Sequence, residues 1–259
     1  MEDLQSIVLL IDADNTQLSK LEDIIREIST HGRIVVKRAY GNWKKDVLKN
    51  WEEEIKRLAI KAEQQFDYVS GKNATDMALV IDTISLLHRG IYDAFVIVAS
   101  DSDYTPLAIH LHESGVHVIG VGEKKTPISF RNSCDEFIFL ENLGAEKKSR
   151  STALPGPRRK NKDTAENNVD VSTEQDEPEE SINWVHDLLR EASDRYQDDD
   201  GYVNVSSAGQ FIKRVKPDFD VRSFGFLKLP KLIEAFPDRY EMIKYPGKGK
   251  VKIVAYRVK

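Results

Sequence analysis

The stretch FVIVASDSDYTPLAIHLHESGVHVIGVG, residues 95–122, decides the fold. It begins and ends with apolar runs, 95–99 and 116–122, that have the length of buried strands. Between them, residues 104–114 have helical spacing, and Pro106 stands where a helix tolerates proline. Parallel strands require a crossover of this kind, so the stretch predicts a strand–helix–strand unit with parallel strands.

The remainder of residues 1–143 continues the same alternation. Further strands are predicted at 7–11, 33–40, 66–70 and 137–141. Further helices are predicted at 18–29, 43–64 and 75–88, the second from apolar residues on one face. Strict alternation predicts an α/β fold, a doubly wound parallel sheet of order 3-2-1-4-5 with helices on both faces.

Length and composition restrict the class of protein. The chain has 259 residues and a hydrophobic content of 40%, which suits one large domain or two smaller ones. It has no apolar run of membrane-spanning length and no signal peptide, so we expect a cytoplasmic protein without a membrane partner. Its single cysteine, Cys134, excludes a disulfide framework and a cysteine-based zinc site. The sequence carries no feature that sets an oligomeric state.

The net charge of −5 conceals a division along the chain. Residues 1–143 form the predicted α/β domain. Residues 144–180 are predicted to be a disordered charged linker, with seven basic residues in 147–162 followed by eight acidic residues in 163–180. We interpret the basic half as a solvated tether rather than a nucleic-acid arm. Residues 181–259 follow as a second domain.

The second domain has the pattern of a small winged-helix α+β unit. Helices are predicted within 182–196, 201–215 and 220–236, and a hairpin joins 240–245 to 251–258. The hairpin and the tail after it are basic: Lys244, Lys248, Lys250, Lys252, Arg257 and Lys259. Tyr245 and Tyr256 lie among these residues. Lysine and arginine supply phosphate affinity and aromatic rings can stack on unpaired bases, so RNA contact is favoured over a merely solubilising strand.

Carboxylates follow the strands that should be neighbours in the first domain. The polar residues at these strand ends and at the start of the central helix are Asp12, Asp14, Asn15, Asp76, Asp101 and Asp103. Each alone could cap a helix or end a strand. All three segments point to one edge of a parallel sheet, where functional groups collect. Clustered carboxylates repel one another unless they bind a proton or a divalent cation, and Mg²⁺ and Mn²⁺ prefer oxygen ligands.

Two families resemble this pattern. Asp12 to Thr16 fits the D-x-D-x-T nucleophile motif of the haloacid dehalogenase phosphatases, and Ser100 resembles their strand-end serine. The later acidic metal motif and the cap insertion of that family are missing. That resemblance therefore rests on five residues, with Asp12 as its nucleophile.

The second resemblance covers residues 5–141. LLIDADN, GKNATDMALVIDTISLL and the stretch 95–122 resemble the NYN domain, a branch of the PIN-like nucleases that includes the LabA-like proteins. The S-G-D-S-D-F element of that family corresponds to Ala99–Tyr104, with Ser100 in place of glycine. The resemblance implies a PIN-like fold and a metal-dependent ribonuclease. The implied active-site residues are Asp12, Asn15, Asp76, Asp101 and Asp103.

These resemblances lead to one interpretation of the whole chain. Residues 181–257, above all FGFLKLPKLIEAFPDRYEMI, resemble the OST-HTH or LOTUS domain, which is linked to RNA binding and to protein partners. We predict a ribonuclease with Mg²⁺ or Mn²⁺ bound by Asp12, Asp76, Asp101 and Asp103, with Asn15 orienting a ligand or a water. The predicted RNA contacts are Lys72, Lys244, Lys248, Lys250, Lys252 and Arg257. A phosphatase and a non-catalytic RNA-binding adaptor remain as alternatives.

Overall fold

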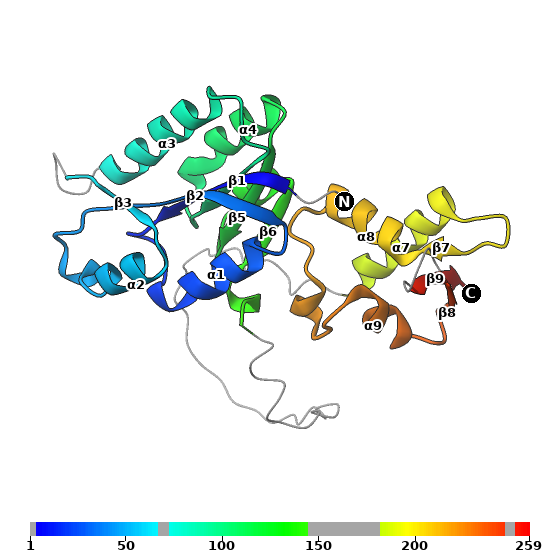
Figure 1. The fold of residues 1–259 in the computed structure, drawn as a ribbon. Helices are drawn as coiled ribbons and strands as arrows, with labels where there is room; N and C mark the ends of the chain where they lie inside the picture. The colour runs from blue at the N-terminus through cyan, green and yellow to red at the C-terminus, as the bar shows by residue number, and fades with distance from the viewer. Residues whose placement is uncertain (1–3, 67–72, 145–181, 247–251) are drawn as a thin grey trace, which may run out of the picture.

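A computed structural model describes residues 4–66, 73–144, 182–246 and 252–259. The first domain contains a parallel sheet of order β3-β2-β1-β4-β5-β6 (Figure 1). Its strands are β1 (Leu4–Asp12), β2 (Gly32–Gly41), β3 (Lys61–Gln64), β4 (Ala94–Val98), β5 (His117–Gly122) and β6 (Glu136–Phe139). The predicted fold class and the order 3-2-1-4-5 are confirmed, and β6 adds the strand predicted at 137–141.

Helices cover both faces of this sheet. One face carries α1 (Leu21–Ile28) and α2 (Trp51–Arg57), and the other carries α3 (Ala74–Leu87), α4 (Thr105–Glu113) and α5 (Ile128–Asn132) (Figure 1). Successive strand residues point to opposite faces, so Leu9 and Leu10 of β1 lie in different apolar clusters. Short 3₁₀ helices occur at Leu18–Lys20, Asp46–Leu48, Ser102–Tyr104 and Leu140–Asn142.

The prediction of one helix over 43–64 is wrong. The segment contains a loop, the 3₁₀ helix at Asp46–Leu48, α2, and then β3. The helix cannot extend through Ala59, because this residue has a φ of 51° and is therefore in the left-handed conformation. β3 is therefore the polar segment KAEQ, paired with the end of β2. The third strand was predicted at 66–70, but Phe66 lies in a loop and 67–70 fall outside the described residues.

The second domain combines helices with a small antiparallel sheet of order β7-β9-β8. Its elements are α7 (Asn183–Tyr196), β7 (Val203–Asn204), α8 (Val205–Val215), a 3₁₀ helix (Val221–Phe224), α9 (Leu229–Glu234), β8 (Tyr240–Pro246) and β9 (Lys252–Val258). Gly225, with a φ of 81°, separates the 3₁₀ helix from α9 within the region predicted as helical. A core that includes Leu189, Ile212 and Tyr256 joins the helices to the sheet.

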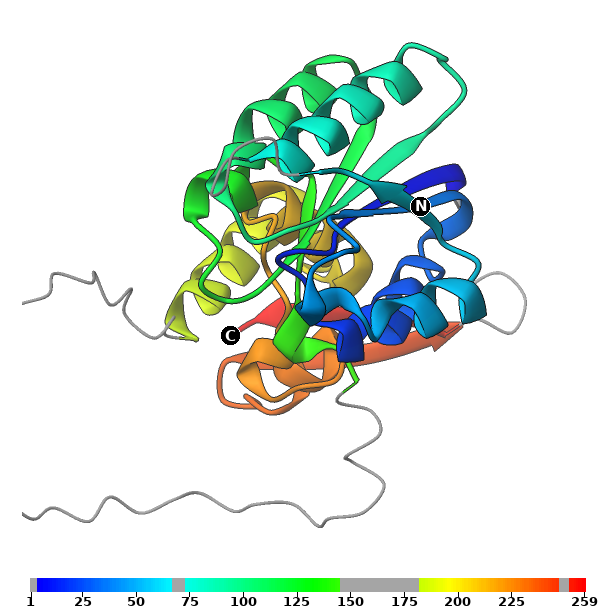
Figure 2. The same cartoon turned by 90° about the vertical axis from the view of Figure 1, so that its left-hand side faces the viewer.

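The two domains touch beside β6, and we call this surface the interdomain contact. The Phe137 amide of β6 donates to the Pro217 carbonyl at 2.8 Å, so the segment after α8 runs alongside this strand. Arg131 and Asp218, both buried, form an ion pair at 3.0 Å. Figure 2 shows the second domain behind the first. Of the predicted linker, Gly144 is described and residues 145–180 lie outside the described residues.

Within the described ranges, no helix has the length and apolar character needed to cross a membrane.

Candidate active site

The carboxyl ends of β1 and β4 bring the predicted acidic residues together. Ile11 of β1 pairs with Val98 of β4, so the segments that follow these strands leave the sheet side by side. Asp12 is the last residue of β1, and Asp101 and Asp103 follow β4. Asp76 lies in the first turn of α3. We call this group of acidic side chains the acidic crevice.

Asp12 is the buried residue of the acidic crevice. Its side chain accepts hydrogen bonds from the Asp14 amide at 3.1 Å and from Asn15 Nδ2 at 2.8 Å. Burial is the main cause that raises the pKa of Asp12, to about 6, and the charges of Asp76 and Asp14 add to it against the opposing hydrogen bonds. Two hydrogen bonds therefore hold the Asp12 carboxylate in place, but they do not offset the effect of burial on its charge.

Tyr104 connects Asp12 to Asp76. Its hydroxyl lies 2.8 Å from Asp76 Oδ1 and 3.3 Å from Asp12 Oδ2, inside the apolar cluster under α3 and α4. Burial and the two carboxylates raise the pKa of Tyr104, so the hydroxyl stays protonated and remains a donor. Burial also raises the pKa of Asp76, and the charges of Asp101 and Asp103 contribute in the same direction.

Asp101 and Asp103 form the more exposed side of the acidic crevice. Asp101 Oδ1 accepts the Asp103 amide at 3.0 Å and so caps the 3₁₀ helix at Ser102–Tyr104. Asp103 Oδ2 accepts a hydrogen bond of 2.8 Å from Asn73 Nδ2, just before α3. The capping role expected of a lone aspartate is therefore present in Asp101.

Asp14 is held by groups from two other segments. Thr75 Oγ1 donates to Asp14 Oδ2 at 2.9 Å, and Lys45 Nζ lies 3.2 Å from Asp14 Oδ1. Lys45 belongs to the loop after β2, the strand beside β1. A third strand, besides β1 and β4, therefore brings a residue to the acidic crevice. The contact brings one cation to the edge of a strongly acidic group.

The donor set of the acidic crevice suits a hard divalent cation. Burial is the main cause of the raised pKa of Asp12, and the nearby carboxylates of Asp76 and Asp14 add to it. Carboxylate oxygens are ligands that hard divalent cations prefer. Over the described ranges, no three acidic, histidine or cysteine side chains are arranged to hold a metal ion by themselves. Mg²⁺ normally keeps several waters and binds one or two carboxylates directly. The residues therefore suit a hydrated divalent cation rather than a fully enclosed ion.

Sequence reasoning missed four residues that contact this group: Lys45, Asn73, Thr75 and Tyr104. Tyr104 carried a usable signal, because the motif of the resembling family has phenylalanine there and the hydroxyl is the added group. Lys45 was assigned to a helix, which hid its reach to Asp14. Ser100, in place of the motif's glycine, accepts the Glu123 amide at 2.9 Å and so connects the ends of β4 and β5.

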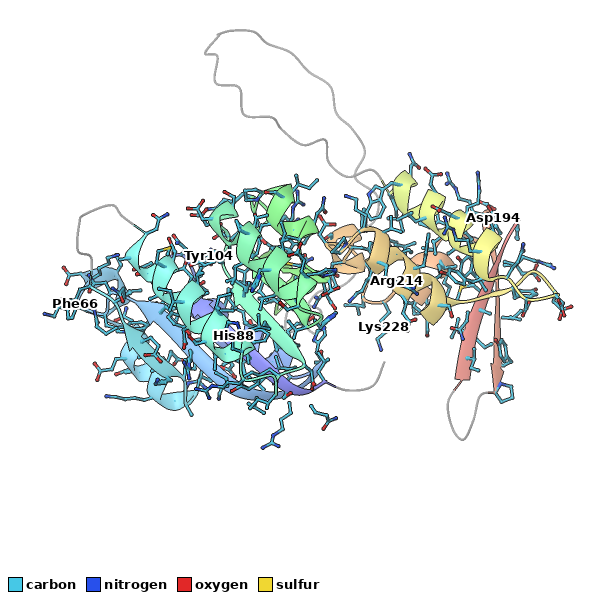
Figure 3. All side chains as sticks on the ribbon, turned by 90° about the horizontal axis from the view of Figure 1, so that it is seen from above. Phe66, His88, Tyr104, Asp194, Arg214 and Lys228 are labelled. Atoms are coloured by element: carbon cyan, nitrogen blue, oxygen red, sulfur yellow. The ribbon has the colours of Figure 1, made fainter. Side chains whose placement is uncertain are left out.

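Of the predicted RNA contacts in the second domain, the two with described side chains lie on its hairpin and not at the acidic crevice. Lys244 lies on β8, and Arg257 on β9 forms an ion pair with Glu241 at 2.6 Å. Lys72, Lys248 and Lys250 fall outside the described residues, as does the side chain of Lys252. Figure 3 shows the second domain at one end of the molecule, away from the labelled Tyr104 of the acidic crevice.

One predicted stacking residue is wrong. Tyr256 is fully buried and its hydroxyl donates to the Leu189 carbonyl at 2.6 Å, so its ring belongs to the core of the second domain. Tyr245 remains partly exposed on β8.

The fold and the acidic edge together define a PIN-like domain of the nuclease type. The NYN domain model matches residues 6–141, more than half of the chain, and the chain belongs to this family. The OST-HTH/LOTUS domain model matches residues 176–252, which adds a domain type that binds RNA.

Solved structures show weaker likeness. A protein of unknown function from Vibrio parahaemolyticus is 15% identical, with a TM-score of 0.43, over 54% of this chain and 94% of that chain. An uncharacterized protein from Nitrosomonas europaea is 23% identical, with a TM-score of 0.26, over 40% of this chain and 92% of that chain. No curated protein matches the chain.

Proposed function

We propose that this chain is a metal-dependent ribonuclease that hydrolyses RNA phosphodiesters. The observation that carries the proposal is the acidic crevice, in which Asp12 is buried beside Asp76 and linked to it by Tyr104. Membership in the NYN family supports a nuclease-type activity, and the OST-HTH match supports RNA as the substrate. Asp12, Asp76, Asp101 and Asp103 would hold Mg²⁺ or Mn²⁺.

Each side chain has a distinct part in this proposal. A bound divalent cation supplies an activated water and stabilises charge on the phosphate. Asn15 holds Asp12 in place through its amide and orients a ligand or a water. Asp101 and Asp103, which are less buried than Asp12, would accept a proton from the water. Hydrolysis joins the water oxygen to phosphorus, breaks one P–O bond and releases the ribose oxygen with a proton.

The test is Asp101→Asn with mixed RNAs as substrate. Asparagine keeps a capping oxygen for the Asp103 amide, so the fold should be retained while one ligand charge is lost. We expect cleavage to fall by at least about a hundredfold, the scale on which metal sites respond to lost support. Asp46→Asn, an equal charge change on an exposed 3₁₀ helix, is the matched control. Wild-type turnover by Asp101→Asn in excess metal would exclude its role.

The phosphatase alternative receives less support. Asp12 would have to attack phosphorus, yet its carboxylate is fully buried and already accepts hydrogen bonds from Asp14 and Asn15. Detection of a covalent phosphate on Asp12 would nevertheless favour the phosphatase. The adaptor alternative would be favoured if the chain bound Mg²⁺ or Mn²⁺ without cleaving any RNA.

We propose that the second domain captures RNA through its basic hairpin. In this proposal, RNA is contacted by Lys244 on β8 and Arg257 on β9. Lys248, Lys250 and Lys252, which lie between them in the sequence, would contribute further contacts. Each phosphate contact contributes a slope of about −0.7 to −0.9 in log affinity against log salt. Replacing Lys248, Lys250 and Lys252 by alanine should flatten the slope by about two to three if all three contact phosphate. An unchanged slope would favour protein partners for this domain.

A further inference from the structure

An aromatic ring and a lysine lie exposed at the outer end of the sheet of the first domain. Phe66, just after β3, is 50% exposed. Lys44 Nζ, from the loop after β2, lies 5.0 Å from the centroid of its ring. We call these residues the Lys44–Phe66 pair. A large exposed aromatic ring beside a cation is a typical contact for unpaired nucleic-acid bases.

The Lys44–Phe66 pair stands on a well-connected part of the backbone. The Trp43 amide donates to Gln64 Oε1 and the Trp43 indole donates to the Glu63 carbonyl, both at 3.1 Å. Gln64 Nε2 donates in turn to Asn42 Oδ1 at 3.1 Å. These bonds fasten the loop after β2 to the end of β3. A ring presented from such a position loses little conformational entropy when a ligand binds.

The same loop leads from the Lys44–Phe66 pair into the acidic crevice. Lys45, the next residue along, lies 3.2 Å from Asp14. β3, which precedes Phe66, is separated from β1 by β2 alone. Figure 3 shows Phe66 at the end of the molecule that lies away from the second domain. The Lys44–Phe66 pair therefore adjoins the lysine that contacts Asp14, and its ring lies remote from the second domain.

We infer that the Lys44–Phe66 pair binds an unpaired base of single-stranded RNA next to the acidic crevice. The ring offers a stacking face that any base can use, and a base already stacked within a duplex has no free face to give. The exposed side chain of Lys44 can leave the ring for a neighbouring phosphate as the base takes its place. This inference rests on the proposed function for its substrate class, and it adds a base-stacking contact made by Phe66 and Lys44.

The test combines photocrosslinking with affinity, on the full chain in EDTA so that metal-dependent cleavage is stopped. A single-stranded RNA containing 4-thiouridine should crosslink to Phe66, as mapped by mass spectrometry. Phe66→Ala should lower single-strand affinity by about five- to a hundredfold, the range for loss of one stacked base. Phe66→Tyr should stay within about threefold, because it keeps the ring. Duplex affinity should not change in either variant.

Val47→Ala is the matched control, since Val47 is 78% exposed on the neighbouring 3₁₀ helix and offers no ring. The inference is overturned if crosslinks form elsewhere in the chain but not at Phe66, or if Phe66→Ala binds single strands as the wild type does. Failure of the proposed function would be seen differently. A wild-type chain that cleaves no RNA in Mg²⁺ or Mn²⁺, yet crosslinks at Phe66, would retain this binding site and lose the ribonuclease assignment.

Discussion

The surroundings of Asp12 disfavour a negative charge on its carboxyl group. The side chain is fully buried, and Asp14 and Asp76 bring further negative charge to it. Its pKa is raised to about 6 from an ordinary value of 3.8. Without metal, the folded state therefore binds a proton at Asp12 more tightly than the unfolded state does. Stability contributed by this group is present below the unfolded pKa and is lost as pH rises through about 6.

The variant Asp12→Asn tests this balance directly. Without metal at pH 8, it should raise the free energy of unfolding by about 1–3 kcal/mol, because a pKa shift of one unit corresponds to about 1.4 kcal/mol and asparagine carries no charge. Near pH 4 the gain should disappear. Chemical denaturation at both pH values measures the difference. A loss of stability at pH 8 would contradict the argument.

The residues found and missed at this site follow a physical rule. Asp12 and Asp101 were predictable because parallel strands end at one edge, which makes distant residues meet. Tyr104 was not, because a tyrosine within an apolar helical pattern looks like a core residue, and its ring is indeed in the core. Only the three-dimensional structure shows that its hydroxyl reaches the two carboxylates. Lys45 depended on the path of a loop, which periodicity does not describe.

At the scale of elements, α2 and β3 show where periodicity fails. Trp51 and Ile55 pack into the core as a helical face predicts, but Val47 of the same pattern is 78% exposed. β3 has the sequence KAEQ, which has little intrinsic preference for a strand. Its pairing with the end of β2 makes it a strand, and this is a tertiary contact that a local pattern does not contain.

Ala59→Gly tests the turn between these two elements. Ala59 has a φ of 51°, where a Cβ is strained and glycine is not. We expect the substitution to stabilise the protein by about 0.5–1 kcal/mol, after the larger entropy of glycine in the unfolded chain is deducted. Thermal unfolding of the two proteins gives the difference.

Ala62→Gly provides the opposite control. Ala62 lies within β3, where added backbone freedom brings no relief of strain, so we expect a loss of about 0.5–1 kcal/mol. Equal effects of the two substitutions would show that the φ of Ala59 is unimportant.

At the scale of the whole molecule, the interdomain contact includes a titrating group. Glu136 of β6 pairs with His31 at 3.3 Å and with Lys213 of α8. Burial opposes the charge of Glu136, but the His31 hydrogen bond and the Lys213 charge outweigh it and lower the pKa to about 2. The hydrogen bond to Glu136 is the main cause that raises the pKa of His31.

The signs define a pH range for this contact. The Glu136 contribution is present above its unfolded pKa near 4.5 and is lost as pH falls toward 2. The His31 contribution is present below 6.5 and is lost as pH rises through its higher folded pKa. We therefore expect the melting temperature to fall between pH 6.5 and 8.5, and the fall to be smaller in His31→Gln.

His110→Gln is the control for that experiment, because His110 is exposed on α4. It should follow the wild-type pH dependence. If the melting temperatures of His31→Gln and His110→Gln fall by the same amount over this range, the His31–Glu136 pair is not the cause of the pH dependence.

The backbone bond from Phe137 to Pro217 has a consequence for the first domain in isolation. β6 is the last strand of the sheet, so a fragment ending near residue 144 would present its unpaired backbone groups to solvent. The opposite border, β3, is short and bears Lys61, features that discourage pairing between chains. We expect the fragment to self-associate through β6, which light scattering against the full chain would detect. A monodisperse fragment would show that β6 needs no cover. Self-association of the fragment, in contrast, would mean that the second domain also protects the first domain from aggregation.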